Sequence, residues 1–503
     1  MGSLKLAEIQ LSKTEKEIEQ LLVDASAYID ESQTDRSEDL VLRFTGGWVR
    51  DKLLGYESHD LDVAVNCMTG YDFANRLQEF LVKNPLKYGE SMKGIHKIEM
   101  NPDKSKHLET ATANIHGVDL DFVNLRTESY ANDSRIPVME FGTPEQDAYR
   151  RDATINALFY NLHTGKIEDF TGRGLDDLRK GVIATPLPAL ETFTDDPLRV
   201  LRLIRFAGRF GFQIEKLTFG AMKADVINAA VQEKVSKERI GIEVHKMLLG
   251  TGAHTCSLLL IETNIYSAIF KPLQYDIKTV EYDMQRNVEI AEDLVVIVRT
   301  LMFSKHKQMF FSEVEDQREL RLVQYLFALV APWSSVKVST KFDTTMLLIR
   351  DSLKLSTARA TEVANVVKQV PSAIELVTNG GWTRVNIGMA IRNFGKNWQL
   401  VFFSAFVTEI HRLQGREDNW LESPAVVHLN GQYDRLLQFV TKNNLAGSWS
   451  MKPIIDGKVV MKALNLQSGP WLKNLLPKVV EWQLEFPDKS AEDCIEHVKT
   501  LEL

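Results

Sequence analysis

The 503-residue sequence has few cysteines, no long apolar run and no excess of positive charge. Its three cysteines, Cys67, Cys256 and Cys494, lack the close spacing of a structural zinc site, and their odd number is unlike a disulfide framework. They fit a reducing compartment. No stretch reaches the roughly 20 apolar residues that a transmembrane helix needs. The sequence therefore excludes a disulfide-stapled secreted domain and predicts no membrane partner.

The N-terminus has no apolar signal core, and its acidic residues argue against a mitochondrial presequence. The formal net charge is −8, which argues against broad, sequence-independent adhesion to DNA. It leaves room for a defined RNA partner held by local basic surfaces. We expect an intracellular protein of the cytoplasm, with the nucleus and the mitochondrion as further compartments, and no obligate protein partner.

The most informative stretch opens with an apolar, β-prone segment at 41–44, which predicts a buried strand. Gly46 and Gly47 follow and open a predicted helix over 48–54. Glycines let the backbone come close to a ligand, and the amides at a helix N-terminus favour an anion. Arg50, one turn into this helix, can reach the same anion.

A second predicted strand follows the helix and carries Asp60 and Asp62. Because residues two apart in a strand point to the same side, the two carboxylates are presented together. Such a pair can hold Mg²⁺, which keeps several waters and bridges to substrate phosphates. The alternative is a tight turn followed by two solvated aspartates. A phosphate cradle beside paired carboxylates favours nucleotidyl transfer by metal ions.

At these residues the sequence resembles a known family. G-G-x-V-R-D followed by D-x-D is similar to the nucleotide-binding signature of the tRNA nucleotidyltransferase and bacterial-type poly(A) polymerase family. These are the class II members of the polymerase-β-like nucleotidyltransferases. The resemblance implies that Asp60 and Asp62 hold Mg²⁺ and that Gly46, Gly47 and Arg50 hold the triphosphate.

A third carboxylate is expected on a later strand at 118–125. Asp119 and Asp121 lie on the face of this strand opposite Leu120. The resemblance, through the spacing to Arg126, points to Asp121 as the third catalytic carboxylate. A solvent-facing acidic strand is the alternative, and the choice between the two aspartates stays open.

The next stretch, 128–144, lacks periodicity and predicts a flexible loop. Residues 145–160 then predict a helix with Arg150, Arg151 and Asp152 inside it. Adjacent guanidiniums can meet phosphates, and a carboxylate can accept a hydrogen bond from a ribose hydroxyl. Arg-Arg-Asp alone is a common surface triplet. Its place after the D-x-D strand resembles the family's ribose-selecting motif, which implies that Asp152 and Arg151 contact the nucleotide.

A predicted helix beginning near Pro197 carries an arginine every three or four residues. These arginines share one side of the helix, opposite an apolar side: Arg199, Arg202, Arg205 and Arg209. Asp195 and Asp196 precede Arg199 closely enough for carboxylate and guanidinium to project together. The stretch resembles the family's E-D-x-x-R element, which reads the incoming base. Asp195 replaces the usual Glu, Asp196 and Arg199 match directly, and a capped, salt-bridged helix is the alternative.

Another predicted helix, at 235–250, contains Ser-x-Glu-Arg-Ile followed by Glu243. This pattern resembles the family's last shared motif, whose implied role is to stabilise the base-reading helix. From about residue 251 onward the sequence is helical in character. Several cations there could meet an RNA backbone, although most fit solvated faces: Lys305, Lys307, Arg359, Lys368, Arg384, Arg392 and Lys396.

Over most of its length the sequence resembles CCA-adding tRNA nucleotidyltransferases of the eukaryotic type. The resemblance implies an α/β head with a polymerase-β-like mixed sheet, then an all-α neck, body and tail, at 1–180, 181–260, 261–420 and 421–503. The base-reading helix would add Asp195 and Arg202 to the nucleotide site. The implied reaction adds C, C and A to the 3′ end of tRNA from CTP and ATP. A poly(A) polymerase of the same family and a catalytically dead tRNA-binding protein are the alternatives.

Overall fold

The computed structural model describes residues 4–32, 38–58, 60–88, 92–98, 110–129, 138–273, 276, 280–312, 316–413 and 419–501. The chain divides into two units. The first comprises Met1–Met247 and Glu262–Ile269, and the second comprises Leu248–Ile261 and Phe270–Leu503. In the part of the chain that the structure describes, no helix combines the length and apolarity needed to cross a membrane.

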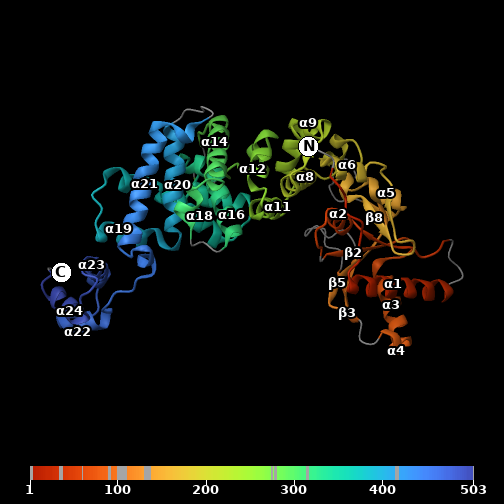
Figure 1. Ribbon diagram of the computed structural model, residues 1–503, viewed down its shortest axis with the longest axis horizontal. Helices are drawn as coiled ribbons and strands as arrows, with labels where there is room; N and C mark the ends of the chain where they lie inside the picture. Colours follow the sequence, from red (N-terminus) through yellow and green to blue (C-terminus); the bar gives the residue numbers. More distant parts are fainter. Residues whose placement is uncertain are drawn as a thin grey trace. The chain divides into compact units, whose positions relative to one another are not determined.

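The first unit is built on a seven-stranded mixed sheet in the order β3-β4-β5-β2-β1-β8-β9 (Figure 1). Its strands are β1 (Leu42–Thr45), β2 (Leu61–Val65), β3 (Met92–Ile98), β4 (Thr110–Ile115), β5 (Val118–Asn124), β8 (Leu158–Asn161) and β9 (Lys166–Asp169). β2 and β5 run parallel, and the other neighbouring pairs are antiparallel. The mixed sheet confirms the predicted α/β head. β5 matches the strand predicted at 118–125.

One face of this sheet is an apolar core. Phe44 pairs with Val63, which pairs with Phe122, and all three side chains are fully buried. α3 (Gly70–Lys83) packs against β4 and β5. A Cβ at Gly70 would lie 2.0 Å from the carbonyl oxygen of Phe122, so glycine is needed for α3 to approach β5 this closely.

The helix that follows β1 is hydrogen-bonded to a buried carboxylate of α1 (Lys13–Ser32). Glu15, near the start of α1, accepts hydrogen bonds from Trp48 Nε1 at 3.0 Å and Lys52 Nζ at 2.8 Å. Both donors belong to α2 (Gly47–Leu53). Because the two helices share this network, α1 fixes the position of α2 and of the glycines that open it.

The stretch predicted as a flexible loop, 128–144, is partly a strand. β6 (Arg126–Ser129) pairs antiparallel with β7 (Val138–Phe141) in a separate two-stranded sheet. Residues 130–137 lie outside the described residues. The prediction was wrong at β7 because this short strand owes its conformation to pairing across the chain rather than to its own periodicity.

The helix predicted over 145–160 is also wrong in its length. α5 covers only Pro144–Tyr149, and the backbone at Ala153 is extended, with φ −142° and ψ 144°. Residues Thr154–Asn156 form one 3₁₀ turn before β8. The last part of the predicted helix is taken into the sheet beside β1, so sheet pairing overrides local helix propensity.

A short helix, α4 (Pro85–Tyr88), follows α3, and the remaining helices of the first unit come after β9 in the sequence. They are α6 (Gly174–Lys180), α7 (Ala189–Asp195), α8 (Leu198–Phe210), α9 (Lys216–Met222), α10 (Asp225–Lys234), α11 (Lys237–Leu249) and α13 (Ile265–Ile269). α8 matches the helix predicted after Pro197, and α11 matches the helix predicted at 235–250. The short strands β10 (Val182–Ile183) and β11 (Gln213–Ile214) pair in parallel between α6 and α9.

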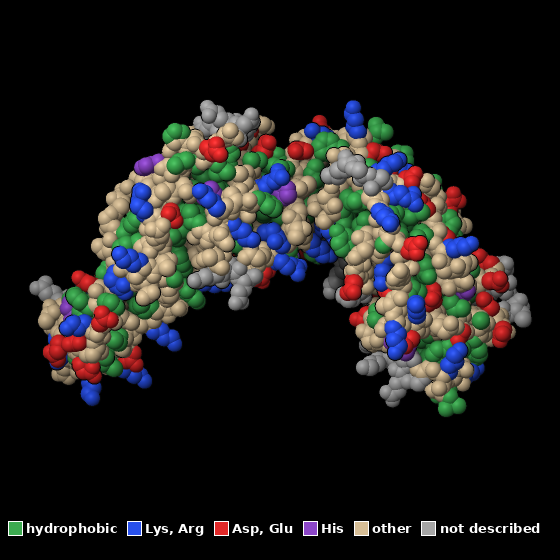
Figure 2. Space-filling view, viewed as in Figure 1, with side chains coloured by type: hydrophobic (Ala, Val, Ile, Leu, Met, Phe, Trp, Pro, Cys, Tyr) green, Lys and Arg blue, Asp and Glu red, His purple; other side chains and the backbone are tan. Residues whose placement is uncertain are grey.

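In the residues described, the second unit is helical, which confirms the prediction for the C-terminal half (Figure 1). Its principal helices are α12 (Ala253–Glu262), α14 (Met284–Met302), α15 (His306–Phe311), α16 (Gln317–Val330), α18 (Thr357–Asn379), α19 (Arg384–Phe394), α20 (Trp398–Leu413), α21 (Pro424–Lys442), α22 (Gly457–Leu464), α23 (Trp471–Glu485) and α24 (Ala491–Lys499). The last three share a small core that includes Val460, Val479 and Trp482. Acidic side chains gather over α24 in the space-filling view (Figure 2).

Candidate active site

The face of the sheet opposite the apolar core carries a polar row. Thr45 at the end of β1 pairs with Asp62 of β2, and Asp62 pairs with Asp121 of β5. Side chains of residues that pair across neighbouring strands lie on the same face, so the two carboxylates stand side by side. Thr112 of β4 extends the row and donates a hydrogen bond to Asp121 Oδ1 at 2.5 Å.

The two other candidate carboxylates occupy different surroundings. Asp60 is exposed and lies just before β2, so it is not within the strand as predicted. Asp119 is exposed, pairs in register with Asn114 and accepts a hydrogen bond from Asn114 Nδ2 at 2.7 Å. Of the two aspartates of β5, Asp121 is therefore the one placed beside Asp62.

Burial raises the pKa of Asp62 to about 6. The guanidinium of Arg151 opposes this rise in pKa, whereas the charges of Asp121 and Asp60 add to it. The protein thus holds a partly desolvated carboxylate close to two others. Mutual repulsion of this kind is relieved by a cation.

The donor set fits a divalent cation that is completed by substrate. Among the described residues, no three His, Cys, Asp or Glu side chains converge into a ready-made metal cage. Mg²⁺ commonly uses one or two protein carboxylates and fills its other positions with water and substrate phosphates. With Asp60 and Asp62 as its protein ligands, Mg²⁺ would keep coordination positions for water and substrate phosphates.

Gly46 lies between the carboxylates and the arginines. Its φ is +71°, in the left-handed region that favours glycine. A Cβ there would lie 3.0 Å from an Nη of Arg151 and 3.9 Å from Asp62 Oδ2. Any larger residue at this position would therefore push the Arg151 guanidinium away from the end of β1. α2 then begins at Gly47 with its amides free of a side-chain cap.

Arg50 points into the protein. Its side chain is only 5% exposed, pairs with Asp51 at 2.7 Å and donates a hydrogen bond to Asn156 Oδ1. Its guanidinium carbon also lies 5.3 Å and 4.8 Å from the ring centroids of Phe206 and Phe210 of α8. Arg50 therefore joins the glycine turn to the helix predicted to read the base.

Arg150 and Arg151 both turn back onto one carboxylate. Asp147 of α5, with a side chain 2% exposed, pairs with Arg150 and lies 2.7 Å from Arg151. Burial by itself raises the pKa of Asp147, but Arg151 and Arg150 outweigh it and hold that pKa below its usual range. This shared partner orients the Arg151 side chain, whose guanidinium carbon lies 5.0 Å from the ring centroid of Phe159.

Asp152 contacts α8, the helix predicted to read the base, and is buried. Its carboxylate accepts hydrogen bonds from Arg202 Nε at 2.5 Å and Asn156 Nδ2 at 2.9 Å. Burial favours its neutral form, yet Arg202, Asn156 and Arg199 together hold the pKa of Asp152 well below its usual range. The carboxylate is therefore ionised at neutral pH and remains an acceptor.

Asp196 and Arg199 each have a partner outside the predicted pair. Arg239 of α11 clasps Asp196 with two hydrogen bonds, of 3.3 Å and 2.8 Å. Arg199 is 7% exposed, and one Nη donates to the carbonyl oxygen of Arg150 at 2.8 Å. Asp196 Oδ1 also accepts the N–H of Leu198 at 3.2 Å, which caps the start of α8.

The other predicted members of this segment lie around the same helix. Asp195 is the last residue of α7, immediately before Asp196. Arg205 of α8 pairs with Glu243 of α11 at 2.6 Å. This is a second ion pair to α11, in addition to the one between Arg239 and Asp196. α11 thus contacts the segment predicted to read the base through two ion pairs, which is the stabilising contact that the motif beginning at Ser236 implies.

We expect Arg239→Met to relax nucleotide selection. The resemblance implies that Asp196 reads the base, and without Arg239 its carboxylate loses its fixed orientation. On that assignment, discrimination against UTP and GTP should fall by about tenfold. Steady-state incorporation of each nucleotide measures the effect. Glu243→Gln is the matched control, because it removes the other ion pair between α8 and α11. An equal loss of selectivity in both variants would assign the effect to helix packing and not to Asp196.

Sequence reasoning missed two residues of this site, Asp147 and Thr45; it included Arg239 in the Ser-x-Glu-Arg-Ile motif but did not predict its contact with Asp196. Asp147 and Arg239 are singled out by their ion pairs with predicted site residues, and those pairs appear only in three dimensions. Thr45 is buried, and its hydroxyl has no hydrogen-bond partner among the described residues, although it stands next to Asp62 in the polar row. Its place directly before the two glycines is the signal that could have drawn attention to it.

Some cations that were expected to face solvent in the second unit are structural. Arg384 donates to the carbonyl oxygens of Leu484 at 2.8 Å and Asn443 at 2.6 Å. Arg392 likewise donates to the carbonyl oxygen of Met451. These two side chains fasten α19 to later segments, so the prediction of solvated cations was wrong for them.

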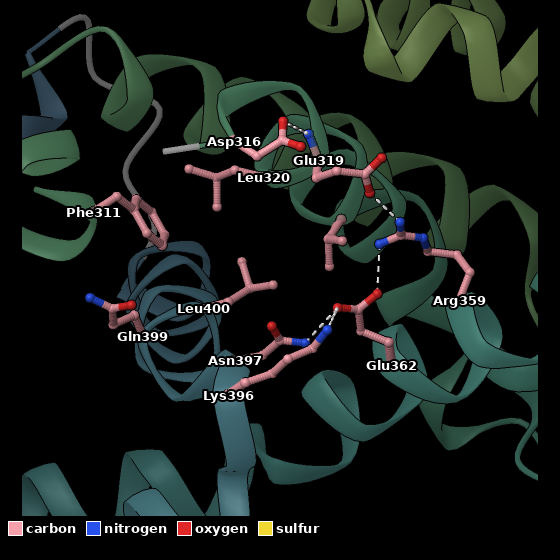
Figure 3. Close-up of a pocket in the computed structure, with 11 residues that line it drawn as sticks. Phe311, Asp316, Glu319, Leu320, Arg359, Glu362, Lys396, Asn397, Gln399 and Leu400 are labelled. Carbon is pink, nitrogen blue, oxygen red and sulfur yellow. Dashed lines mark hydrogen bonds and ion pairs between the residues drawn. The ribbon is translucent and has the colours of Figure 1, made fainter. Parts of the chain in front are cut away.

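Arg359 belongs to a polar clasp beside a cavity of about 310 Å³ (Figure 3). Its guanidinium lies between Glu319 of α16 and Glu362 of α18, at 2.6 Å from the latter. Asn397 Nδ2 donates to the other oxygen of Glu362 at 2.7 Å. These contacts join α16, α18 and the 3₁₀ turn Gly395–Asn397 that precedes α20. They engage the Arg359 guanidinium with two carboxylates, and its side chain is only 19% exposed.

Comparison with known proteins connects this site to a family. Residues 42–184 match a family model described as the poly A polymerase head domain, and residues 211–277 match one described as a probable RNA- and SrmB-binding site of polymerase A. The CCA tRNA nucleotidyltransferase, mitochondrial, of Candida glabrata is 39% identical over 98% of this chain and 96% of its own length. The Saccharomyces cerevisiae protein of the same name is 38% identical over 99% and 95%.

The chain belongs to the CCA tRNA nucleotidyltransferase family. Two solved structures share its fold. The Thermotoga maritima CCA-adding enzyme complexed with tRNA has a TM-score of 0.63 at 19% identity and covers 98% of each chain. The Bacillus stearothermophilus CCA-adding enzyme in complex with CTP has a TM-score of 0.57 at 18% identity and covers 97% of each. Nucleotidyltransferases of this family generally use a divalent metal ion.

Proposed function

We propose that the protein adds C, C and A in order to the 3′ end of tRNA, using CTP and ATP and releasing pyrophosphate. The observation that carries this proposal is the row of Asp62 and Asp121 directly beside the Gly46–Gly47 turn. The similarity to CCA tRNA nucleotidyltransferases along nearly the whole chain supports the choice of substrate. No template strand is needed, because protein side chains would read the base.

Mg²⁺ is the proposed metal, with Asp60 and Asp62 as its ligands. When bound, it would neutralise charge on the triphosphate and make the α-phosphate more open to attack. Asp121 would act from the same face by orienting the attacking 3′-hydroxyl of the tRNA. Its hydrogen bond from Thr112 occupies one carboxylate oxygen, Oδ1, and leaves Oδ2 for this contact.

The phosphates and the ribose would be held by the turn and its neighbours. Gly46 and Gly47 would offer backbone amides, and Arg151 would offer a guanidinium already oriented by Asp147. Asp152 stays ionised and would accept a hydrogen bond from a ribose hydroxyl. Arg50 would contribute to triphosphate binding chiefly by bracing the turn against α8, because its guanidinium is buried there.

The base would be read by Asp196 and Arg199, with Asp195 and Arg202 completing the pocket. Cytosine and adenine both present an amino donor beside a ring acceptor, and a carboxylate next to a guanidinium complements that pattern. Uracil and guanine present a carbonyl where the amino group should be, so they face the carboxylate unfavourably. The half-buried ion pair with Arg239 would hold the Asp196 carboxylate in a fixed orientation for this contact.

The helical part of the chain is the proposed tRNA carrier. We assign 1–180 to the catalytic head, 181–260 to a base-reading neck, and 261–420 and 421–503 to a body and a tail that bind tRNA. Two relatives bear the word mitochondrial in their names, so we propose the mitochondrion, beside the cytoplasm and nucleus, as a site of action. Imaging of the full chain with a C-terminal tag tests this location.

A poly(A) polymerase remains the second candidate, because the head matches a model described by that activity. The test uses purified protein, Mg²⁺ and a tRNA that lacks its last three nucleotides, with each labelled nucleotide supplied alone and then CTP with ATP. We expect two C from CTP alone and one further A when both are present. A long A tract would favour the poly(A) polymerase. No incorporation of any nucleotide would favour a catalytically inactive tRNA-binding protein.

A further inference from the structure

Phe303 is the most exposed large aromatic side chain in the described part of the protein, at 77%. It stands at the C-terminal end of α14, where its N–H donates to the carbonyl oxygen of Arg299 at 3.1 Å. The next residue is fixed as well, because Ser304 Oγ donates to the carbonyl oxygen of Leu301 at 2.8 Å and lies 2.7 Å from His306 Nδ1. The ring therefore projects from a rigid turn.

A second ring meets Phe303 from another helix. The His254 imidazole of α12 lies edge-on to it, with centroids 6.2 Å apart and planes at 75°. His254 Nε2 is 3.0 Å from Thr255 Oγ1, which restrains the ring. Burial and the neighbouring Arg299 lower the pKa of His254, so the imidazole is neutral at neutral pH. Together the two rings form an aromatic corner in which most of the Phe303 side chain stays exposed.

Cations surround this corner without carboxylate partners. Arg299 and Lys305 are exposed, Lys307 is partly exposed, and in the described residues none of the three forms an ion pair. Arg321 of α16 donates to the carbonyl oxygen of Leu249 at 3.0 Å, and its Nε–H is buried without a partner among the described groups. Lys and Arg side chains also gather over α12 and α16 in Figure 2.

We infer that Phe303 and His254 form a stacking platform for an unpaired nucleobase of the tRNA substrate, with Arg299, Lys305 and Lys307 on the adjacent phosphates. An exposed π-face among unpaired cations suits RNA, because bases stack on the ring while the cations meet the backbone. His254 lies within 211–277, the segment matched by the RNA-binding family model. The inference rests on the proposed function and adds a contact remote in sequence from every candidate catalytic residue.

The experiment measures tRNA affinity and steady-state kinetics of the full chain with Phe303 replaced by Ala, Leu or Trp. Loss of one stacked base weakens binding by about five- to a hundredfold, so Phe303→Ala should raise Kd and KM for tRNA by that factor while kcat is retained. Phe303→Leu keeps an apolar side chain but no π-face and should behave like Ala. Phe303→Trp should bind as tightly as wild type.

Val296→Ala is the matched control, because Val296 is an exposed apolar residue of the same helix. Lys305→Gln should lower affinity and reduce the slope of log Kd against log salt by about one. Unchanged tRNA affinity in Phe303→Ala, or wild-type affinity in Phe303→Leu, would contradict base stacking on Phe303. Either result would favour a protein as the partner of this surface. A wild-type protein that incorporates neither CTP nor ATP would instead contradict the proposed function.

Discussion

Asp62→Asn is expected to reduce nucleotide incorporation by at least about a thousandfold, which corresponds to several kcal/mol of lost charge stabilisation around the metal and phosphates. The stability of the folded protein should not decrease. Burial and the charges of Asp121 and Asp60 raise the Asp62 pKa to about 6, so its ionised form is disfavoured by the folded protein at neutral pH. The variant should therefore melt at an equal or higher temperature, and tRNA affinity should stay within about twofold.

This combination separates a catalytic group from a structural one, since a structural carboxylate would lower the melting temperature when it is removed. Asp119→Asn is the matched control, because Asp119 is an exposed aspartate of β5 that bonds Asn114 and does not adjoin Asp62. It should retain activity within about twofold, whereas Asp121→Asn should lose activity. An Asp62→Asn enzyme with more than about a tenth of wild-type activity would contradict the role of the pair in metal binding.

Replacing Asp196 should have a larger effect on nucleotide selectivity than on the rate of incorporation. A mispaired buried polar group costs about 1–3 kcal/mol, so Asp196→Ala should relax discrimination against UTP and GTP by roughly ten- to a hundredfold. Asp196→Asn should go further, because its amide can donate to the carbonyl of uracil or guanine. The measurement is the ratio of kcat/KM for UTP and GTP to that for CTP and ATP.

Stability has to be followed in the same experiment, because Asp196 also caps α8 and pairs with Arg239. Asn can still accept the N–H of Leu198, but it removes the charge that pairs with Arg239. The melting temperature of Asp196→Asn is therefore compared with that of Arg239→Met, which loses the same ion pair and keeps the Asp196 carboxylate. Arg199→Ala should weaken all incorporation, since it removes the other half of the pair. Wild-type nucleotide ratios in both the Asp196 and Arg199 variants would mean that the base is read elsewhere.

Local patterns sufficed where the fold depends on neighbouring residues. The strand–glycine–helix unit from Leu42 to Leu53 was predicted from an apolar run, two glycines and a helical period, and the structure has all three parts. The position of Asp121 beside Asp62 could not be predicted from local patterns alone. Alternation shows only that Asp119 and Asp121 share a face, whereas the parallel register of β2 and β5 decides which one adjoins Asp62.

Long-range pairing explains the errors. The stretch around Arg151 has helical periodicity, but both arginines turn back to Asp147 and the residues after them join β1 as a strand. Arg384 was read as a solvated cation because no local signal reveals carbonyl oxygens 59 and 100 residues away. The clasp between Arg239 and Asp196 spans 43 residues and was invisible for the same reason.

The proposed function requires that one protein site accepts both CTP and ATP without a nucleic-acid template. Calorimetric titration of the full chain in Mg²⁺, without tRNA, tests it most directly. We predict one CTP site per chain, displacement of CTP by ATP at that same site, and binding of UTP and GTP weaker by at least about tenfold. Independent sites for CTP and ATP, or UTP binding as tight as CTP binding, would contradict the account.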